Sequence, residues 1–439
     1  MKIAVVGMGK IGLPLAVQYA KKGNTVTGID INSKTVDLIN KGLEPFPEEA
    51  HLKEYLADVV GKGLLNATLD YEEGIKSADV VVVAVPLFVN DKAEPEFSAM
   101  DQATQSIGSH VKKGALICYE TTLPIGTTRT RFVPALEKKS GLKVGIDFNV
   151  VFSPERVFTG RIFEDLRKYP KIVGGITQEC TTKGVGFYTQ VLEFDRREDL
   201  AKPNGVWAVE SAESAEFVKL AETTYRDVNI ALANQFAMYA DKIGVNVYEV
   251  IEAANSQKFS FLHQPGISVG GHCIPIYPQF YLWSDPEASI VRIARETNSQ
   301  MPTYFINEIL KSFSTLKNLN VLILGISYRA NVKEIAFSGA VDLKNILAES
   351  GAKVFAMDPF YTKSEINEIG FEYGDDPSQA FDVVILHTNH QEFSKIDFSK
   401  FSKSSKLLDG RNFYSKEKVP SNIDFFKFGN VTKKGKNGN

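Results

Sequence analysis

The chain begins with an apolar run that leads directly into a glycine-rich turn. Ile3-Ala4-Val5-Val6 precedes Gly7-Met8-Gly9-Lys10-Ile11-Gly12, and residues 14–22 then carry a helical pattern. A strand, a glycine turn and a helix in this order open a doubly wound α/β sheet. The first glycine permits the tight turn and the third lets the helix pack closely on the strand. We therefore predict a strand over residues 2–7 and a doubly wound α/β domain behind it.

Further runs rich in β-branched residues follow in the first third of the chain. They are continuously apolar rather than alternating, as expected when helices cover both faces of a parallel sheet. Strands are predicted over residues 24–30, 80–85, 115–119 and 149–152. We assign residues 1–200 to this first domain.

The middle of the chain is helical in pattern. Residues 211–244 form an Ala-rich stretch that contains no glycine or proline before Gly244. Such a stretch is far longer than the mean helix of about 11–12 residues, so it is expected to bridge domains or to pack against a partner helix. Further elements are predicted as a helix over 247–255, a glycine-dense loop over 265–271 and another helix reaching about residue 298.

The alternation of strands and helices resumes near residue 318. Strands are predicted over 321–325, 353–358, 382–387 and 406–408, with a helix over 338–351. The predicted fold class is therefore α/β, with two Rossmann-like doubly wound domains joined by a central all-helical dimerisation domain. The domain boundaries are predicted at 1–200, 201–305 and 306–430, with a disordered tail over 431–439.

Composition limits the classes of protein that the chain can belong to. A length of 439 residues favours two or three domains. A net charge of −3 gives no reason to expect binding to nucleic acid or to an anionic membrane. Three cysteines argue against a disulfide framework, and the start of the chain shows no signal peptide. We predict a cytoplasmic protein without a membrane span or a metal site.

The glycine turn predicts a dinucleotide site. Gly9 would let the backbone approach a pyrophosphate at the helix N-terminus. Asp30 ends the second predicted strand, where its carboxylate would accept hydrogen bonds from both ribose hydroxyls and would repel the 2′-phosphate of NADP. NAD is therefore the predicted cofactor. The alternative is a plain structural turn.

Cys273 is the sharpest feature of the second half. A lone buried cysteine is usually an inert small hydrophobe, and Cys118 and Cys180 are interpreted in this way. Cys273 instead follows the glycine-dense loop, which would leave its backbone open to a ligand, and His272 precedes it. A neighbouring His or Lys would favour the nucleophilic thiolate. From the residues alone, Cys273 could be either a reactive nucleophile or an inert core cysteine, and both interpretations stay open.

Several segments together resemble the UDP-glucose/UDP-mannosamine dehydrogenase family along nearly the whole chain. They are residues 7–12, 120–124, 153–157, 219–222, 269–273 and 409–411, and their order and spacing are specific. Members with His before the cysteine resemble the branch that acts on UDP-N-acetylhexosamines, whereas members acting on UDP-glucose more often carry Ser.

The resemblance implies a four-electron oxidation of a sugar C6 alcohol to a carboxylate with two NAD, in polysaccharide biosynthesis. Cys273 would capture the intermediate aldehyde as a thiohemiacetal, and a second oxidation would give a thioester that water hydrolyses. Sulfur suits this chemistry because a thiohemiacetal keeps the reacting carbon in place and a thioester is easily hydrolysed.

The resemblance also implies roles for individual residues. Lys219 would stabilise oxyanions at C6, Glu155 would be the general base for hydrolysis, and Thr122 would position the water or contact the cofactor. Arg411 would contact the nucleotide diphosphate or the sugar. Without the resemblance, these residues would be a surface lysine, a loop or N-cap carboxylate, a turn hydroxyl and a surface arginine. Cofactor contacts are predicted at Gly7, Gly9, Lys10, Ile11, Gly12, Asp30, Val85, Pro86, Thr122 and Arg329. Substrate contacts are predicted at Glu155, Arg156, Val157, Lys219, Thr223, Gly270 and Arg411.

The chain departs from the family pattern at positions that contact the substrate or support the catalytic residues, and not at Cys273, Lys219, Glu155 or the glycine turn. Tyr277 replaces an aspartate four residues after the cysteine, and it cannot serve as an anion at neutral pH because the usual pKa of tyrosine is about 10. Other departures are Thr223 for asparagine, Phe259 beside Lys258 near a missing arginine, Ala336 and Phe337 for arginine and glutamate, and Leu87-Phe88 for Thr-Pro.

These departures leave alternatives open. The chain could perform a single or transient NAD-linked oxidation, or it could be a weakly active UDP-sugar-binding protein. A simple hydroxy acid dehydrogenase is disfavoured, because a hydroxy acid needs no second nucleotide-binding domain. The wide apolar faces of residues 211–244 predict a homodimer formed through this helix.

Overall fold

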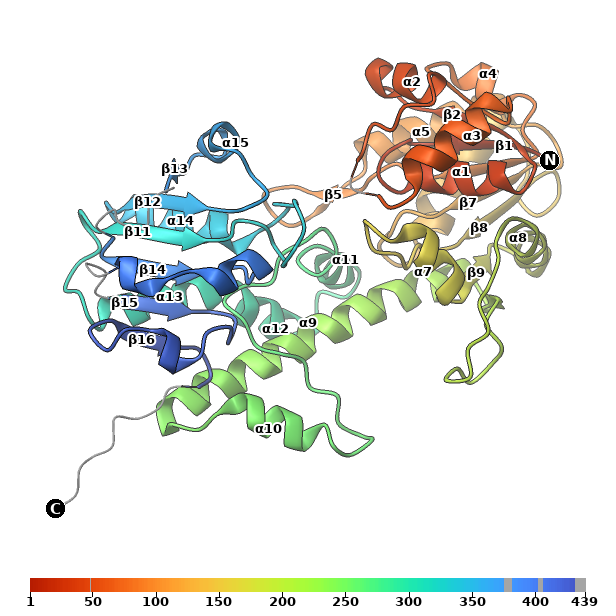
Figure 1. Ribbon diagram of the computed structural model, residues 1–439. Helices are drawn as coiled ribbons and strands as arrows, with labels where there is room; N and C mark the ends of the chain where they lie inside the picture. The colour runs from red at the N-terminus through yellow and green to blue at the C-terminus, as the bar shows by residue number, and fades with distance from the viewer. Residues whose placement is uncertain (48, 375–380, 402–405, 431–439) are drawn as a thin grey trace. The chain divides into compact units, whose positions relative to one another are not determined.

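The computed structural model describes residues 1–47, 49–374, 381–401 and 406–430. The chain divides into two compact units, each described by itself below (Figure 1). The first unit holds Met1–Glu222 and Gln279–Asp285, and the second holds Thr223–Pro278 and the chain from Pro286 onward. The tail predicted over 431–439 lies outside the described residues.

Within the described part of the first unit, eight strands form one sheet in the order β10-β9-β8-β7-β4-β1-β2-β3. All neighbouring strands are parallel except β8 and β9, which are antiparallel. The strands are β1 (Lys2–Val6), β2 (Thr25–Ile29), β3 (Leu65–Thr68), β4 (Val80–Val83), β7 (Leu116–Tyr119), β8 (Asn149–Phe152), β9 (Lys171–Gly175) and β10 (Val206–Ala208). A separate antiparallel hairpin pairs β5 (Phe88–Val89) with β6 (Pro95–Glu96).

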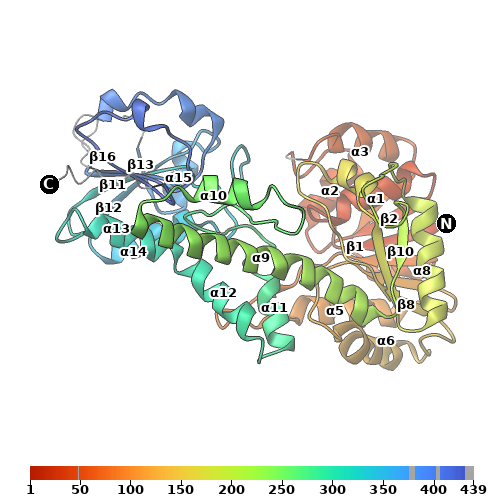
Figure 2. The same ribbon diagram turned by 90° about the horizontal axis from the view of Figure 1, so that it is seen from below.

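Helices pack on this sheet and bury its strands. The four valines of β4 are all buried, as the continuous apolar run predicts for a strand covered on both faces. The helices are α1 (Gly12–Lys21), α2 (Ser33–Asn40), α3 (Leu52–Gly61), α4 (Tyr71–Ile75), α5 (Ser98–His110), α6 (Val133–Ser140), α7 (Ile162–Lys168) and α8 (Gln178–Val191), with a π-helix η1 (Thr128–Phe132). The apolar core on one face joins the strands to α1, α3, α7 and α8, and α5 and α6 lie side by side (Figure 2).

The second unit repeats the strand order of the first. Six strands of its described residues form an entirely parallel sheet in the order β13-β12-β11-β14-β15-β16, which matches the run β3-β2-β1-β4-β7-β8 of the first sheet. The strands are β11 (Asn320–Leu324), β12 (Lys353–Met357), β13 (Glu372–Tyr373), β14 (Val383–Leu386), β15 (Lys406–Asp409) and β16 (Asp424–Lys427). Its helices are α10 (Val247–Ala254), α12 (Ser289–Ser299), α13 (Met301–Leu310), α14 (Gly339–Glu349) and α15 (Lys363–Glu368), with short 3-10 turns η2 (Gln391–Lys395), η3 (Phe398–Phe401) and η4 (Lys416–Lys418).

The long central helix is confirmed as α9 (Ala212–Ile243), which begins in the first unit and ends in the second. The prediction of a single helix that follows the glycine-dense loop and reaches about residue 298 is wrong. Two helices, α11 (Tyr277–Ser284) and α12, stand there instead. Pro286 lies between them, and proline removes a backbone donor and disfavours helical geometry in the residue before it. The predicted fold class, two doubly wound α/β sheets with a helical region between them in the sequence, is confirmed.

Candidate active site

The glycine turn after β1 has the geometry of a phosphate-binding loop. Gly7 adopts a φ of +90°, and a Cβ atom on Gly12 would lie 1.8 Å from the carbonyl oxygen of Gly7. Both positions therefore require glycine for the chain's own packing. A Cβ atom on Gly9 would meet no atom within 4 Å, so the space above Gly9 is open at the beginning of α1. This combination fits a pyrophosphate at the helix N-terminus.

Asp30 stands at the carboxyl end of β2, beside this turn. Its Oδ2 accepts a hydrogen bond from the Met8 amide at 2.7 Å, and its Oδ1 accepts one from the Asn32 amide at 2.9 Å. An ionised carboxylate has about four lone-pair sites, so two remain for ribose hydroxyls. The residues of this turn therefore fit NAD, and Lys10 and Ile11 lie within it, both half-buried.

The second sheet repeats this turn, but the chain's own donors occupy the carboxylate at the end of its second strand. The Gly325 amide donates to the Met357 oxygen, as the Gly7 amide donates to Ile29, with 2.8 Å in both cases. Asp358 takes the place of Asp30, but it is buried and accepts from the Ile326 amide at 2.8 Å, from Phe360 and from His390. The chain's own donors thus occupy Asp358, and Arg329 lies in this second turn.

The loops after β4 and β7 contribute the other predicted cofactor contacts. The Val85 oxygen accepts a hydrogen bond from Thr121 Oγ1 at 2.6 Å, which ties the two loops together. Pro86 is exposed, Val85 is half-buried and Thr122 is buried. The carboxyl edge of the sheet, where ligands of doubly wound sheets bind, therefore carries all three predicted residues.

The first unit brings Lys219 and Glu155 together. Lys219, on α9, donates from Nζ to the backbone oxygen of Glu155 at 2.6 Å, and both side chains are buried. Arg156 forms an ion pair with Glu222 and donates to the Pro170 oxygen at 3.1 Å. Val157, a further predicted substrate contact, lines a small pocket with Glu155 and Arg156.

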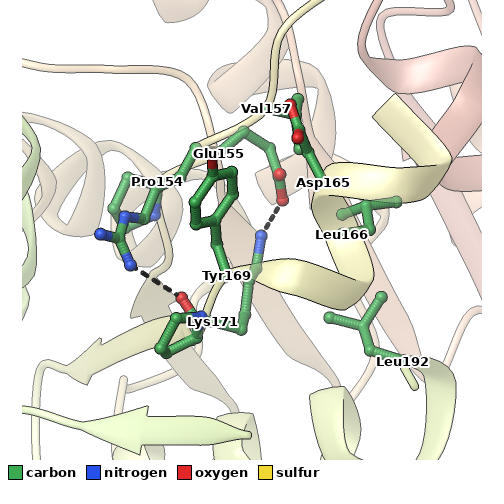
Figure 3. A pocket seen from close by; sticks show the side chains of 10 residues that line it. Pro154, Glu155, Val157, Asp165, Leu166, Tyr169, Lys171 and Leu192 are labelled. Carbon is green, nitrogen blue, oxygen red and sulfur yellow. Dashed lines mark hydrogen bonds and ion pairs between the residues drawn. The ribbon is translucent and has the colours of Figure 1, made fainter. Parts of the chain in front are cut away.

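A buried charge cluster surrounds the Glu155 carboxylate, and the sequence did not indicate it. Lys171 forms ion pairs with both Glu155 and Glu120, and its Nζ lies 2.7 Å from Glu120 Oε2. Figure 3 shows the Lys171 side chain pointing at Glu155. Tyr188 and Tyr19 donate to Glu120 Oε1 at 2.7 and 3.1 Å. The only sequence signal was a lysine at the beginning of an apolar strand.

The glycine-dense loop that leads to Cys273, residues 265–273 and called the cysteine loop below, belongs to the second unit. Cys273 is half-buried, and its carbonyl oxygen accepts from the Tyr277 amide at 2.9 Å. Cβ atoms on Gly270 and Gly271 would lie 2.7 and 2.8 Å from the side chain of Tyr328. These glycines are therefore needed by close packing on the second α/β sheet, a reason for the glycine-dense loop that the sequence did not reveal.

Arg411 follows β15 and is directed into the chain. Its Nε donates to the His387 oxygen at 2.8 Å, and a Cβ atom on Gly266 would lie 2.5 Å from its Nη1. Burial lowers the pKa of Arg411 to about 10. Arg411 thus packs beneath the cysteine loop, and Thr223 is buried on α9 in the same unit.

The remaining predicted features fall as follows. Burial raises the pKa of Cys118 well above its usual value, in agreement with an inert core cysteine, and Cys180 is also buried. Among the residues that the structure describes, no group of three His, Cys, Asp or Glu side chains is placed to hold a metal ion. No helix of the described chain is long and apolar enough to cross a bilayer.

Two doubly wound sheets, one of them with an NAD-type glycine turn, together with a loop cysteine define a class of NAD-dependent dehydrogenases. The NAD binding, central and UDP binding domains of the UDP-glucose/GDP-mannose dehydrogenase family match residues 1–192, 213–300 and 322–416. The chain belongs to this family of NAD-dependent nucleotide-sugar dehydrogenases. The expected family and cofactor are confirmed.

Similar proteins cover nearly the whole chain. UDP-N-acetyl-D-mannosamine dehydrogenase of Pyrococcus horikoshii is 33% identical over 95% of this chain and 97% of its own. NDP-N-acetyl-D-galactosaminuronic acid dehydrogenase of Ralstonia nicotianae is 31% identical over 95% of this chain and 97% of its own. The solved structure of the Pyrococcus horikoshii enzyme has a TM-score of 0.86 at 31% identity, covering 98% of this chain and 99% of the other.

Proposed function

We propose that this enzyme oxidises the C6 alcohol of a UDP-N-acetylhexosamine to the uronate with two NAD. The observation that carries the proposal is the similarity over nearly the full length to dehydrogenases of UDP-N-acetyl-D-mannosamine and of NDP-N-acetyl-D-galactosaminuronic acid. His272 before Cys273 supports the same branch. Polysaccharide biosynthesis in the cytoplasm is the setting that we infer for this activity.

Cys273 is the proposed nucleophile. When bound, NAD accepts one hydride from C6 in each of the two oxidations. The Cys273 sulfur bonds to the aldehyde carbon and the thiol proton passes to the aldehyde oxygen, which gives a thiohemiacetal. The second oxidation removes a hydride and the hydroxyl proton and leaves a thioester. Water then adds, the carbon–sulfur bond breaks and the thiol is restored. One alcohol, two NAD⁺ and one water thus give one carboxylate, two NADH and three protons.

Residues of the first unit supply charge and proton transfer in this proposal. The Lys219 ammonium stabilises the oxyanions that develop at C6, because a fixed cation at a water-poor site stabilises an anion more strongly than a cation in water does. Glu155 accepts a proton from the attacking water, and Thr122 orients that water or contacts the cofactor. The hydrogen bond from Lys219 to the Glu155 backbone supports the pairing of these two roles.

The proposed substrate contacts are Arg156, Val157, Thr223, Gly270 and Arg411. The proposed domain boundaries are 1–200, 201–305 and 306–430.

A homodimer through α9 is also proposed. Leu232, Phe236, Tyr239 and Ile243 are exposed at 39–59%, and their spacing of four, three and four residues places them on one helix face. An apolar stripe of this kind is typical of a helix that packs against a partner.

A stoichiometry measurement tests the catalytic proposal. Purified protein is given limiting UDP-N-acetylhexosamines, and NADH and uronate are counted beside Cys273→Ala and the control Cys180→Ala. We expect two NADH and one uronate per sugar from the wild type and from Cys180→Ala, and no uronate from Cys273→Ala. One NADH per sugar would instead support a single oxidation, and tight binding without NADH would support a binding protein. Full uronate yield from Cys273→Ala would exclude Cys273 as nucleophile.

A further inference from the structure

The antiparallel strand β9 brings a lysine to the ligand-binding edge of the first sheet. The β8–β9 register pairs Phe152 with Gly174 and Val151 with Gly175, so β9 begins where β8 has ended. Lys171 therefore lies at the carboxyl edge of the parallel strands, level with Glu155, whereas in a parallel strand it would lie at the opposite edge. Ser153 Oγ donates to the Ile172 oxygen at 2.7 Å and fixes this alignment.

The cluster holds one cation for two carboxylates. Glu120 accepts from Lys171, Tyr19 and Tyr188, and all of these side chains are buried. Burial alone would raise the pKa of Glu120, but the charge of Lys171 and the hydrogen bonds with Glu155, Lys171 and Tyr188 bring it below its usual value. Glu120 is thus the carboxylate that the cluster keeps ionised most firmly.

Glu155 is the carboxylate that the cluster holds less firmly. Burial raises its pKa from 4.5 to about 8, and Glu120 adds to this effect as a neighbouring charge and hydrogen-bond partner, while Lys171 opposes both. Two carboxylates that share a buried site cannot both stay ionised without a compensating cation. The charge of Glu155 therefore depends on Lys171.

We propose that Lys171, backed by Glu120, is a positioning residue that favours the ionised form of Glu155 and directs its carboxylate for its role as base in thioester hydrolysis. This inference rests on the proposed function of Glu155. Two lysines then fix the same residue, because Lys219 binds its backbone oxygen and Lys171 binds its carboxylate. Lys171 itself need not touch the substrate.

The pH dependence of hydrolysis separates this role from a purely structural one. In Lys171→Met, Glu155 should need a higher pH to ionise, since an opposite charge lowers a carboxyl pKa by about 1–3 units. We expect hydrolysis near neutral pH to slow on the order of 100-fold and to recover as the pH rises. The thioester on Cys273 should accumulate in intact-protein mass spectra, while the first NADH forms at the wild-type rate.

Two further variants frame this measurement. Lys171→Arg should restore the wild-type pH profile, because it restores the cation. Lys168→Met should leave hydrolysis unchanged, because Lys168 pairs with Glu164 on the surface. An equal loss in both oxidation and hydrolysis, at an unshifted pH profile, would overturn the proposal. Fluorescence of the two tryptophans, Trp207 and Trp283, checks folding, since both belong to the first unit.

A titration that does not depend on activity keeps the two proposals distinguishable. Infrared difference spectra between each protein and its Glu155→Gln partner follow the Glu155 carboxyl band against pH. We expect the band of the protonated acid to persist to a higher pH in Lys171→Met than in the wild type. An identical midpoint in both would overturn the inference. A wild type that forms no thioester would instead defeat the proposed function, and the titration would still decide whether Lys171 controls the charge of Glu155.

Discussion

Glu216 is a buried carboxylate that ties α9 to the beginning of η1. It accepts from the Gly126 amide at 2.6 Å, from the Thr128 amide at 2.9 Å and from Thr128 Oγ1 at 2.6 Å. Burial nevertheless raises its pKa from 4.5 to about 7, against the effect of these hydrogen bonds. Because Glu216 lies one helical turn before Lys219, its protonation state concerns the element that carries a proposed catalytic residue.

The raised pKa of Glu216 predicts a stability that falls as pH rises. The folded state binds more protons than the unfolded state between pH 4.5 and about 7, so the contribution is full below pH 4.5 and is lost as pH rises through 7. Between pH 5 and 8 the wild type should lose up to about 3 kcal/mol more unfolding free energy than Glu216→Gln. Urea denaturation followed by tryptophan fluorescence reports on the first unit.

Glu213 supplies the control for this prediction. It lies on the same helix, but it pairs with Arg129 and its pKa is lowered, because its hydrogen bonds and Arg129 outweigh the effect of burial. Glu213→Gln should therefore keep the wild-type fall in stability between pH 5 and 8. If Glu216→Gln also keeps it, the buried carboxyl group is not the cause.

At the scale of elements, the two sheets use the same strand–turn unit for different purposes. Asp30 keeps lone pairs for a ligand, whereas Asp358 is buried and satisfied by its own chain. Asp30→Asn should weaken NAD binding by roughly 10- to 100-fold, the value of a hydrogen bond to a charged group, with little change in stability. Isothermal titration calorimetry measures this affinity.

Asp358→Asn should show the opposite pattern. Its amide would face backbone donors in a buried position, so we expect a loss of about 1–3 kcal/mol in unfolding free energy and an NAD affinity close to that of the wild type. Scanning calorimetry measures this loss. An NAD affinity that fell as strongly as in Asp30→Asn would contradict the assignment of the cofactor to the first sheet alone.

The elements that sequence predicts well are those whose signal is local. For the valines of β4 and for the glycine turn before α1, a few neighbouring residues are enough to predict the local structure, and both elements are found as expected. The Lys171 cluster could not be predicted in this way. Its partners come from the ends of β7 and β8 and from α1 and α8, and only the antiparallel direction of β9 brings them together. No spacing along the chain encodes that direction.

At the scale of the whole molecule, the apolar stripe on α9 bears on the oligomeric state. Leu232 and its neighbours Phe236, Tyr239 and Ile243 lie on the second unit's part of this helix. Exposed apolar side chains in a row are unusual on the surface of a monomer and commonly mark an interface between proteins. In a homodimer with two-fold symmetry the same stripe would meet its own copy.

A charge placed in this stripe should break the dimer. Sedimentation equilibrium should give twice the chain mass for the wild type, and Leu232→Asp should shift the population toward the monomer, because a buried unpaired carboxylate opposes association. Leu310→Asp is the matched control, since Leu310 has the same exposed fraction of 42% as Leu232 but lies on α13, outside the stripe. It should leave the dimer intact. A wild-type monomer, or equal dissociation by both variants, would show that α9 does not form the interface.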